Sequence, residues 1–546
     1  MTFDSVPKIP KPSNEPILGY MPGSPELKAL RAEIDRLKNM TIDVPLVIGG
    51  EKIFTEEKGT MVMPHNHQHV LGHYSKASKE HLLRAIEAAK EAKEEWESYE
   101  WYERAAVFLK AADLLSGRWR ATLNAATMLG QSKNIFQAEI DSACELIDFL
   151  RFNAYYMQQI YEDQPYSPKG MWNTMDYRPL EGFVFAVTPF NFTSIAGNLP
   201  TSPAMMGNTV LWKPASSAVY SAHFIMELLE EAGLPKGVIN FIPGRGADVG
   251  KVVLPHPDLA GIHFTGSTET FRQMWRIVGE NIATYKSYPR IVGETGGKDF
   301  IFVHESANPV EVAVAALRAS FEYCGQKCSA SSRMYVPKSL WPEIKRIMLE
   351  QLKEFKMGDP EDVETMMNAV IDQAAYEKIT QYISYAEESS EATIITEGTP
   401  DSSVGYFIPP TIIETTNPKF KTMEEEIFGP VLTVYPYDND KFDETLKLCD
   451  QTSIYALTGS IFAKDRAVIK KMTKALRHAA GNFYINDKPT AAVVGQQPFG
   501  GGRASGTNDK AGSYLNLIRW TSVRSIKETF DPPKSFWYPY MRAGKE

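Results

Sequence analysis

The stretch from Glu181 to Val303 constrains the fold of this chain most, because short β-rich runs alternate there with helical segments. The runs are FVFAV, TVLW, VINFI, GIHF and FIFV, at 183–187, 209–212, 238–242, 261–264 and 300–303. Between two of them, AVYSAHFIMELLEEAG at 218–233 repeats apolar residues with a helical period and ends at a glycine. This alternation is typical of a parallel, doubly wound sheet, so an α/β fold is expected.

Length and a second mixed pattern indicate more than one domain. The chain has 546 residues, enough for two to four structural units at roughly 100–200 residues each. A further α/β stretch runs from Pro309 to about Ala479. The first 45 residues are rich in proline and then in charge, with one short helix expected over Pro25–Asn39. We interpret them as an extension wrapped on the main body and expect little function there.

Composition excludes several classes of protein. Lys and Arg total 58 against 67 Asp and Glu, a net charge of -9, and no long basic run is present, so no nucleic acid partner is expected. No apolar run approaches the roughly 20 residues that cross a bilayer, so no membrane partner is expected either. Four cysteines are too few for a secreted disulfide scaffold and favour a reducing compartment.

The amino-terminal sequence MTFDSVPKIPKPSNEP has neither the apolar core of a signal peptide nor an Arg-rich amphipathic helix. A cytoplasmic location is therefore expected, with the mitochondrial matrix, reached by a processed chain, as the alternative. No metal site is predicted.

One cysteine and one glutamate form a candidate catalytic pair. Cys328 lies in CGQKCSA after a helical run, with small residues around it and Lys327 beside it. Glu294 lies 34 residues earlier in GETGGKD, in a bend bounded by glycines. A thiol nucleophile and a carboxylate that activates water suit acyl transfer. The two segments alone equally allow a small buried cysteine without a catalytic role.

Polar residues also follow the expected strands, where open α/β sheets bind ligands. Asn191 in TPFNFT follows the 183–187 run and carries an amide N–H of the kind that an oxyanion needs. LWKP places Lys213 at the end of the next run, and FTGS places Ser267 after another. GRGADVG at 244–250 resembles a dinucleotide fingerprint whose last glycine comes one residue late. Each of these features alone is equally a turn or a surface residue.

Taken together, six segments occur in the order that characterises one superfamily. TPFNFT, LWKP, FTGS, GETGGKD, GQKCSA and EEIFGPV follow one another as in the aldehyde dehydrogenase superfamily, which the chain resembles over roughly residues 45 to 530. Longer strings resemble, within it, the delta-1-pyrroline-5-carboxylate dehydrogenase family. They are QAEIDSACELIDFLRFNA, FEYCGQKCSASSR, VGQQPFGGGRASGTNDK and FTGSTETFRQMW, in which Phe271 replaces a common glycine.

The resemblance implies an aldehyde dehydrogenase-like fold, with a Rossmann-type cofactor domain, an α/β catalytic domain and a small oligomerisation flap. It divides the chain into an NAD-binding domain (1–158, 181–290 and 479–505), a catalytic domain (291–478), and a flap with a tail (159–180 and 506–546). A homo-oligomer, a dimer or larger, is implied as well. The tail is rich in Tyr and Trp, which the sequence leaves open as core or as an oligomer contact.

The implied activity is oxidation of L-glutamate gamma-semialdehyde, the open form of pyrroline-5-carboxylate, to L-glutamate with NAD as acceptor, the second step of proline catabolism. At positions that match the family's motifs, Cys328 is the nucleophile, and the Asn191 side chain and the Cys328 N–H hold the oxyanion. Glu294 activates the water that hydrolyses the thioester. The alternatives are another semialdehyde or general aldehyde dehydrogenase, or a protein that keeps the fold without turnover.

The resemblance also assigns binding residues. The cofactor contacts that it implies are Pro189, Lys213, Ser216, Thr265, Gly266, Ser267, Glu426 and Phe428. The substrate contacts are Glu145, Phe192, Ser329, Ala491, Ala492 and Phe499, with Lys488–Ala492 as the loop that anchors the substrate carboxylate. Two positions depart from the usual pattern. Ser216 stands where many NAD-dependent members have a glutamate that repels a 2′-phosphate, and Ala491 stands where the anchor loop usually has glycine.

Overall fold

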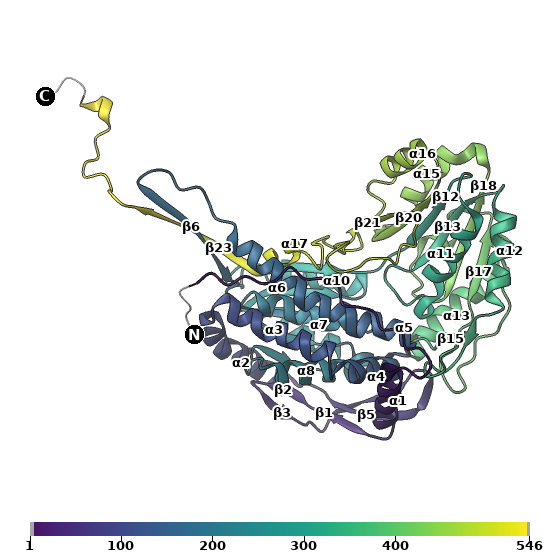
Figure 1. Ribbon diagram of the computed structural model, residues 1–546, viewed down its shortest axis with the longest axis horizontal. Helices are drawn as coiled ribbons and strands as arrows, with labels where there is room; N and C mark the ends of the chain where they lie inside the picture. The colour runs from purple at the N-terminus through teal and green to yellow at the C-terminus, as the bar shows by residue number, and fades with distance from the viewer. Residues whose placement is uncertain (1–4, 543–546) are drawn as a thin grey trace.

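A computed structural model describes residues 5–542 and shows two α/β lobes and a projecting arm (Figure 1). The first lobe contains a seven-stranded sheet in the order β11-β10-β7-β8-β9-β2-β3. The strands from β11 to β9 in this order are parallel, whereas β2 is antiparallel to both of its neighbours. The bounds are Arg290–Glu294 (β11), Leu259–Thr265 (β10), Phe183–Val187 (β7), Thr209–Lys213 (β8), Ile239–Phe241 (β9), Leu46–Ile48 (β2) and Glu51–Ile53 (β3).

Helices cover both faces of the first sheet. Along β7, Phe183 and Phe185 pack into one hydrophobic cluster, and Val184 and Ala186 pack into another. A strand buried on both faces requires the uninterrupted apolar run that this segment has. One face carries α2 (Lys79–Ser98), α9 (Gly246–Val253) and α10 (Thr268–Glu280), and the other carries α3 (Trp101–Ser116), α4 (Arg120–Gln131), α6 (Leu146–Glu162), α7 (Thr193–Met205) and α8 (Val219–Ala232).

Most of the strands expected from the sequence are present. Four of the five expected runs are β7, β8, β9 and β10, and the helix expected at 218–233 is α8, which ends at the left-handed Gly233. The fifth run is β12 (Asp299–Val303), which belongs to the second sheet. The fifth parallel strand of the first sheet is β11 instead. Its sequence RIVGE has only two large apolar residues and charged ends, which leave a weak strand pattern.

The second lobe contains another seven-stranded sheet, in the order β16-β17-β18-β13-β12-β20-β21, in which only β16 is antiparallel to its neighbour. Its strands are Ala392–Ile394 (β16), Thr411–Thr415 (β17), Val431–Tyr437 (β18), Ser331–Pro337 (β13), β12, Thr458–Phe462 (β20) and Asn482–Ile485 (β21). The principal helices are α11 (Pro309–Phe321), α12 (Trp341–Leu352), α13 (Gln373–Glu387), α15 (Phe442–Gln451) and α16 (Arg466–Ala475).

Strand pairing differs from the expected domain boundaries at three places. β11 stays in the first sheet up to Glu294, so the second lobe begins after that residue rather than at 291. β21 pairs with β20, so part of 479–505 belongs to the second lobe. α17 (Tyr514–Leu517) and Trp520 pack into the first core, so the free tail begins later than 506. These domain boundaries depend on long-range strand pairing and on burial, and neither can be read from the spacing of motifs.

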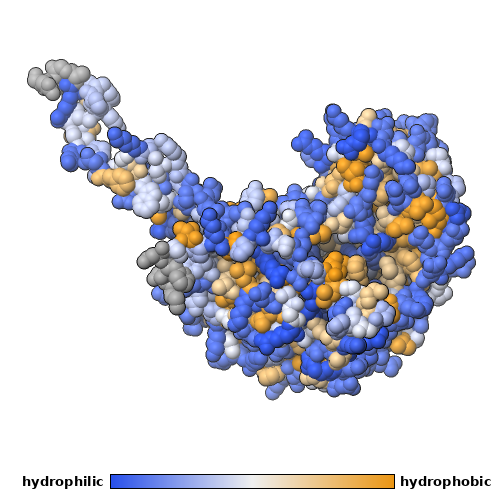
Figure 2. Space-filling model, viewed as in Figure 1, coloured by the Kyte–Doolittle hydropathy of each residue, from blue (hydrophilic) through white to orange (hydrophobic). Residues whose placement is uncertain are grey.

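The arm is a ribbon of β6 (Met171–Pro179) and β23 (Thr521–Thr529), continued by residues 530–542 (Figure 1). It stands clear of the body in the space-filling view (Figure 2). Large apolar side chains along it are exposed, namely Trp172, Val523, Ile526, Phe530, Phe536, Trp537, Tyr538 and Tyr540. Of the expected flap and tail, residues 543–546 lie outside the described part of the chain, as do residues 1–4 of the expected NAD-binding domain.

The amino-terminal extension lies on the first lobe. Residues 5–24 have no regular secondary structure, and hydrogen bonds attach them to α6, from Ile9 to Gln158 and from Asn14 to Asp148. The expected helix follows as α1 (Pro25–Lys38), which Ser24 caps by accepting a hydrogen bond from the Leu27 N–H. A small sheet of β1 (Ile42–Val44), β5 (Asn66–Ser75) and β4 (Lys58–Met63) completes this side.

Candidate active site

Cys328 lies in a strained turn that joins α11 to β13. Tyr323, Cys324 and Gly325 have positive φ angles of 49°, 54° and 64°, a conformation that costs free energy for the two residues with side chains. Two hydrogen bonds connect this turn to the first lobe. The Tyr323 hydroxyl donates to the Gln131 carbonyl at 3.0 Å, and Asn191 Nδ2 donates to the Gln326 carbonyl at 3.0 Å. The predicted nucleophile and the predicted oxyanion residue are therefore brought together.

The GETGGKD segment passes directly against the cysteine. A Cβ on Gly297 would lie 2.2 Å from the Cys328 carbonyl oxygen, so no larger residue fits without displacing the backbone. Glycine at this position therefore allows the GETGGKD backbone to approach the cysteine turn closely.

The thiol of Cys328 is buried, and its surroundings disfavour the thiolate. Burial raises the pKa of Cys328, and the nearby carboxylates of Asp299, Glu294 and Glu426 raise it further. With its pKa raised above the ordinary thiol value, Cys328 is protonated near neutral pH. Attack on a carbonyl carbon then requires a base to accept the thiol proton or a bound group that offsets the negative surroundings.

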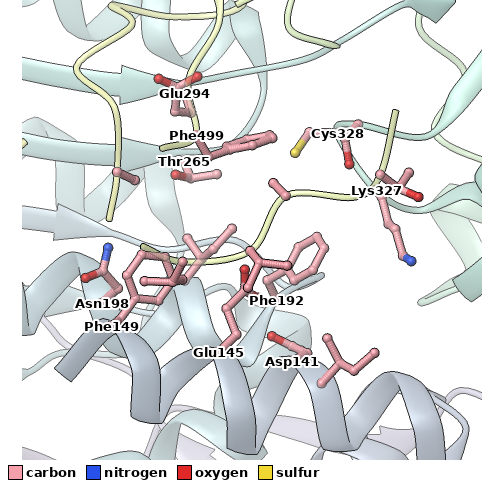
Figure 3. Close-up of a pocket in the computed structure, with 18 of the residues that line it drawn as sticks. Asp141, Glu145, Phe149, Phe192, Asn198, Thr265, Glu294, Lys327, Cys328 and Phe499 are labelled. Carbon is pink, nitrogen blue, oxygen red and sulfur yellow. The ribbon is translucent and has the colours of Figure 1, made fainter. Parts of the chain in front are cut away.

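Glu294 ends β11 and lies on the same cavity. Its Oε2 accepts a hydrogen bond from the Gly501 N–H at 2.9 Å, and its carboxylate points away from the Cys328 sulfur in Figure 3. Gly506 has a φ of +146°, and a Cβ there would lie 2.3 Å from the Gly293 carbonyl oxygen, so the VGQQPFGGGRASG string closes tightly around this carboxylate. Burial raises the pKa of Glu294 well above its ordinary value, although the Gly501 N–H and Lys510 oppose the shift.

Phe271, one of the residues that distinguish the longer strings, packs behind Glu294. Its ring stacks on Phe264 with centroids 5.4 Å apart, and a Cβ on Gly293 would lie 2.3 Å from it. The substitution of a phenylalanine for the common glycine therefore acts on the backbone that carries Glu294.

A cavity of about 180 Å³ opens beside Cys328. In Figure 3 the sulfur faces Phe499, with Thr265 and Glu294 on one side and Phe192 and Glu145 on the other. Of the predicted residues, the cavity is lined by Cys328, Glu294, Glu145, Phe192, Ser329, Ala492, Phe499 and Thr265. Ala491 does not line the cavity, whereas Lys488, Thr490 and Ala492 of the same loop do.

One wall of the cavity is acidic. Glu145 lies in a π-helical turn, Glu139–Glu145, and the Ser194 hydroxyl lies 2.8 Å from both Glu145 Oε2 and Asp141 Oδ1. Burial raises the pKa of Glu145 to about 7, and Asp141 adds to the shift. Sequence reasoning named only Glu145, although Asp141 stands four residues before it in the same string.

Lys133 and Phe192 support this acidic wall. Lys133 Nζ forms an ion pair with Asp141 Oδ2 at 2.7 Å and lies 4.4 Å from the centre of the Phe192 ring. Neither contact was predicted. Lys133 forms its ion pair with Asp141, whereas no cation among residues 5–542 forms an ion pair with Glu145, so Glu145 is the better placed carboxylate for a ligand cation.

Another part of the cavity wall carries cations and the anchor loop. Glu322 accepts hydrogen bonds from Arg318 Nε at 2.8 Å and Lys327 Nζ at 3.1 Å. Burial alone would raise the pKa of Glu322, but Lys327, Lys488 and Arg318 lower it to about 2. Lys488 Nζ donates to the carbonyl and the hydroxyl of Thr490 at 3.1 Å each, which closes the loop on itself. The cavity therefore has one acidic and one basic wall.

The predicted cofactor residues lie at the carboxyl edge of the first sheet. The chain leaves β7 for β8 on one side and returns to β10 on the other, so the edge between β7 and β10 is a topological switch point, where α/β sheets bind nucleotides. Pro189 follows β7, Lys213 ends β8, Thr265 ends β10, and Gly266 and Ser267 follow it. Ser267 is the N-cap of α10 and accepts a hydrogen bond from the Thr270 N–H at 3.2 Å.

Lys213 is a buried cation at this edge. Burial lowers its pKa to about 8, and no carboxylate among residues 5–542 opposes that shift. A Cβ on Gly246 would lie 3.9 Å from Lys213 Nζ, so the GRGADVG turn, which leads into α9, is its neighbour. Ser216 is exposed at the start of the short turn Ser216–Ala218 that follows. An isolated ammonium at such an edge suits an anionic or hydroxyl-rich ligand.

Glu426 and Phe428 reach the site from the second lobe. Glu426 Oε1 accepts a hydrogen bond from the Gly297 N–H at 2.8 Å, beside the cysteine turn. Phe428 has a φ of +62°, and its ring meets Phe190 edge to face with centroids 5.8 Å apart. Phe190 was not predicted, although it stands inside the quoted TPFNFT motif.

Among residues 5–542, no group of three or more His, Cys, Asp or Glu side chains is arranged to hold a metal ion. Over the same range, no helix combines the length and the apolar character needed to cross a membrane.

Known proteins resemble this chain over nearly its whole length. The sequence model of the aldehyde dehydrogenase family matches residues 54–526. The mitochondrial delta-1-pyrroline-5-carboxylate dehydrogenase of Dictyostelium discoideum is 53% identical over 536 residues, which cover 98% of this chain and 96% of that protein. The NAD-bound crystal structure of the delta-pyrroline-5-carboxylate dehydrogenase from Mycobacterium tuberculosis superposes with a TM-score of 0.95 at 51% identity, covering 99% of this chain and 100% of that one.

A more distant solved structure has the same fold. The 1-pyrroline-5-carboxylate dehydrogenase from Thermus with bound NAD superposes with a TM-score of 0.89 at 32% identity, covering 96% of this chain and 100% of that one.

Proposed function

The chain belongs to the aldehyde dehydrogenase family, and on that premise we propose that Cys328 and Glu294 carry out its reaction in the cavity between the acidic and the basic wall. The reaction is the NAD-dependent oxidation of L-glutamate gamma-semialdehyde to L-glutamate, a step of proline catabolism. One observation carries the assignment of residues: a buried thiol lies on a cavity whose two walls have opposite charge, which matches a substrate with an ammonium and a carboxylate group.

Of the groups that the proposed chemistry uses, Cys328 and Glu294 line the cavity, whereas Asn191 does not line it and contacts the cysteine turn at the Gln326 carbonyl. Once the Cys328 thiol has released its proton to water, the sulfur adds to the aldehyde carbon. The second amide N–H of Asn191, which does not bond to the Gln326 carbonyl, is available to the oxyanion together with the Cys328 N–H. Loss of hydride leaves a thioester on the sulfur. Glu294 then takes a proton from the water that cleaves this thioester.

The residues at the sheet edge fit NAD. Lys213 is an unneutralised buried ammonium beside the switch point, and Ser267 lies at the N-terminus of α10, where phosphates bind favourably. Glu426 provides a carboxylate that the Gly297 N–H already holds in place. Bound NAD supplies the hydride acceptor.

NADH formation tests the function directly. With pyrroline-5-carboxylate and a panel of other aldehydes, we expect the highest kcat/KM for pyrroline-5-carboxylate. Absence of NADH formation with every aldehyde would instead support the alternative that the protein keeps the fold without turnover. A higher kcat/KM with another semialdehyde would identify a different enzyme of the same family.

The absence of a carboxylate at Ser216 predicts incomplete discrimination between cofactors. Without repulsion of the 2′-phosphate, NADP should be used measurably, though less well than NAD. Ser216→Glu should lower kcat/KM for NADP by about tenfold or more and change that for NAD little, because like charges in contact cost several kcal/mol. Initial rates with both cofactors test this. A higher kcat/KM with NADP than with NAD in the unmutated enzyme would contradict the cofactor preference.

Ser329 provides a test of substrate recognition. Hydrogen bonds to a charged group contribute about 1.5–3 kcal/mol each, so two such bonds predict that glutamate semialdehyde exceeds hexanal in kcat/KM by at least about a hundredfold. Ser329→Ala should reduce that ratio about tenfold by lowering kcat/KM for glutamate semialdehyde. Hexanal has no carboxylate, so its kcat/KM serves as the internal control. Equal kcat/KM values for the two substrates in the unmutated enzyme would contradict the proposed anchor.

We also propose that the arm joins copies of the chain into a homo-oligomer, a dimer or larger. The support is the row of exposed aromatic and aliphatic side chains, such as Trp172 at 56% and Phe530 at 64% exposure, which monomeric proteins rarely leave in water.

The compartment remains a prediction: cytoplasm was expected, and the mitochondrial names of several relatives favour the alternative of the mitochondrial matrix.

A further inference from the structure

The irregular segment formed by residues 5–24 is fixed to the first lobe by side chains rather than by a sheet. Glu15 forms ion pairs with Arg120 and Arg151, at 2.6 Å each. The Leu18 N–H donates to Glu139 Oε1 at 2.8 Å, in the same π-helical turn that ends at Glu145. These polar contacts are partly buried and fix residues 15–18 in one position on the lobe.

Asn14 makes three side-chain hydrogen bonds in this segment. Its Nδ2 donates to Asp148 Oδ2 at 2.7 Å and to the Val494 carbonyl at 2.7 Å, and its Oδ1 accepts from Gln496 Nε2 at 2.8 Å. A side-chain amide has two N–H groups and one oxygen, so all of its polar groups are engaged. The neighbouring Glu15 N–H donates to Asp148 Oδ1 at 2.8 Å, which fixes Asp148 from a second direction.

The two partners of the Asn14 amide belong to two elements that line the cavity side by side, α6 and the chain that follows the anchor loop. Asp148 lies in α6, one helical turn after Glu145 of the acidic wall. Val494 directly follows Ala492 and Val493 at the end of the anchor loop, and all three line the cavity. Asn14 therefore joins the element that carries Glu145 to the loop that carries the proposed carboxylate anchor.

The Val494 end of the loop is held from two directions. Its side chain packs with Phe149 and Phe152 in a small hydrophobic cluster. The next residue, Gly495, has a φ of +81°, and a Cβ there would lie 2.2 Å from the Phe152 ring. Among residues 5–542, the donor to the Val494 carbonyl is Asn14 Nδ2. This hydrogen bond and the hydrophobic cluster together hold Val494 in place.

We infer that Asn14 is a positioning residue that sets the spacing between the carboxylate anchor and the ammonium-binding wall, and so contributes to the preference for a substrate that carries both groups. The inference rests on the proposed function. It departs from the expectation that the first 45 residues have little function. A substrate without these groups does not depend on the spacing, because only the reaction centre at Cys328 recognises it.

The test compares Asn14→Ala with the matched control Ser13→Ala, an exposed neighbour whose side chain makes no hydrogen bond or ion pair with residues 5–542. Asn14→Ala should raise KM for glutamate semialdehyde about tenfold with kcat within about twofold, because a displaced anchor weakens binding more than chemistry. Hexanal kcat/KM should stay within about twofold in both variants, and Ser13→Ala should match the unmutated enzyme with both substrates.

Gln496→Ala extends the test to a variant that removes only the bond to Asn14 Oδ1 from an exposed side chain, so the fold is not at risk. A KM increase of about two- to threefold, confined to glutamate semialdehyde, is expected. The inference is wrong if neither variant changes KM for glutamate semialdehyde. It is also wrong if kcat/KM falls equally for glutamate semialdehyde and hexanal. If the unmutated enzyme does not prefer glutamate semialdehyde over hexanal, the proposed function itself fails, and that result is visible before any variant is measured.

Discussion

Replacement of Cys328 by alanine is expected to lower NADH formation from pyrroline-5-carboxylate by about ten-thousandfold or more, because no other group on the cavity can form the thioester. NAD binding should be retained, since the proposed NAD contacts Lys213, Ser267 and Glu426 are left in place by the substitution. Initial rates and a direct titration of NAD, followed by protein fluorescence, measure the two properties separately.

The other cysteines provide the controls. Cys449 lies in the second core, and Cys144 lies in the π-helical turn, so Cys449→Ala and Cys144→Ala should stay active. Cys324 stands four residues before Cys328, but its thiol donates to the Asn368 carbonyl at 2.9 Å. Turnover by Cys328→Ala comparable to that of these variants would contradict a thiol mechanism.

The strongly patterned strands of the fold could be predicted from the sequence. FVFAV and TVLW are continuous apolar runs, and such runs are what parallel strands covered on both faces require. β11 could not be predicted, because RIVGE has too few apolar residues to stand out. Its place in the sheet depends on pairing with β10 residue by residue, from Gly261 with Arg290 to Thr265 with Glu294.

The chemistry of the site could be predicted better than its geometry. The motifs name Cys328, Asn191 and Glu294, and the structure brings the first two together through the Gln326 carbonyl. The partners that tune these groups come from distant parts of the chain. Lys510 and the Gly501 N–H act on Glu294, for example, and a contact across more than 200 residues leaves no local pattern. The family expected from the motifs is confirmed.

Glu294→Gln is expected to separate the two halves of the reaction. The glutamine cannot accept a proton, so Cys328 should still form the thioester and release at most one NADH per site, after which turnover stalls. Steady-state turnover should fall by at least about a hundredfold, the usual contribution of a general base. Rapid mixing should show the burst of NADH, and mass spectrometry should find the acyl adduct on Cys328.

The raised pKa of Glu294 gives the same prediction a pH dependence. Because burial raises this pKa well above 4.5, the carboxyl gains its base form only as the pH rises through the raised value. Thioester hydrolysis by the unmutated enzyme should therefore accelerate with increasing pH over that range, whereas the residual hydrolysis in Glu294→Gln should lack this rise. If Glu294→Gln turns over steadily near the unmutated rate, with no adduct on Cys328, the base must be another residue. Glu145, which lines the same cavity and has a pKa of about 7, would be the first residue to test.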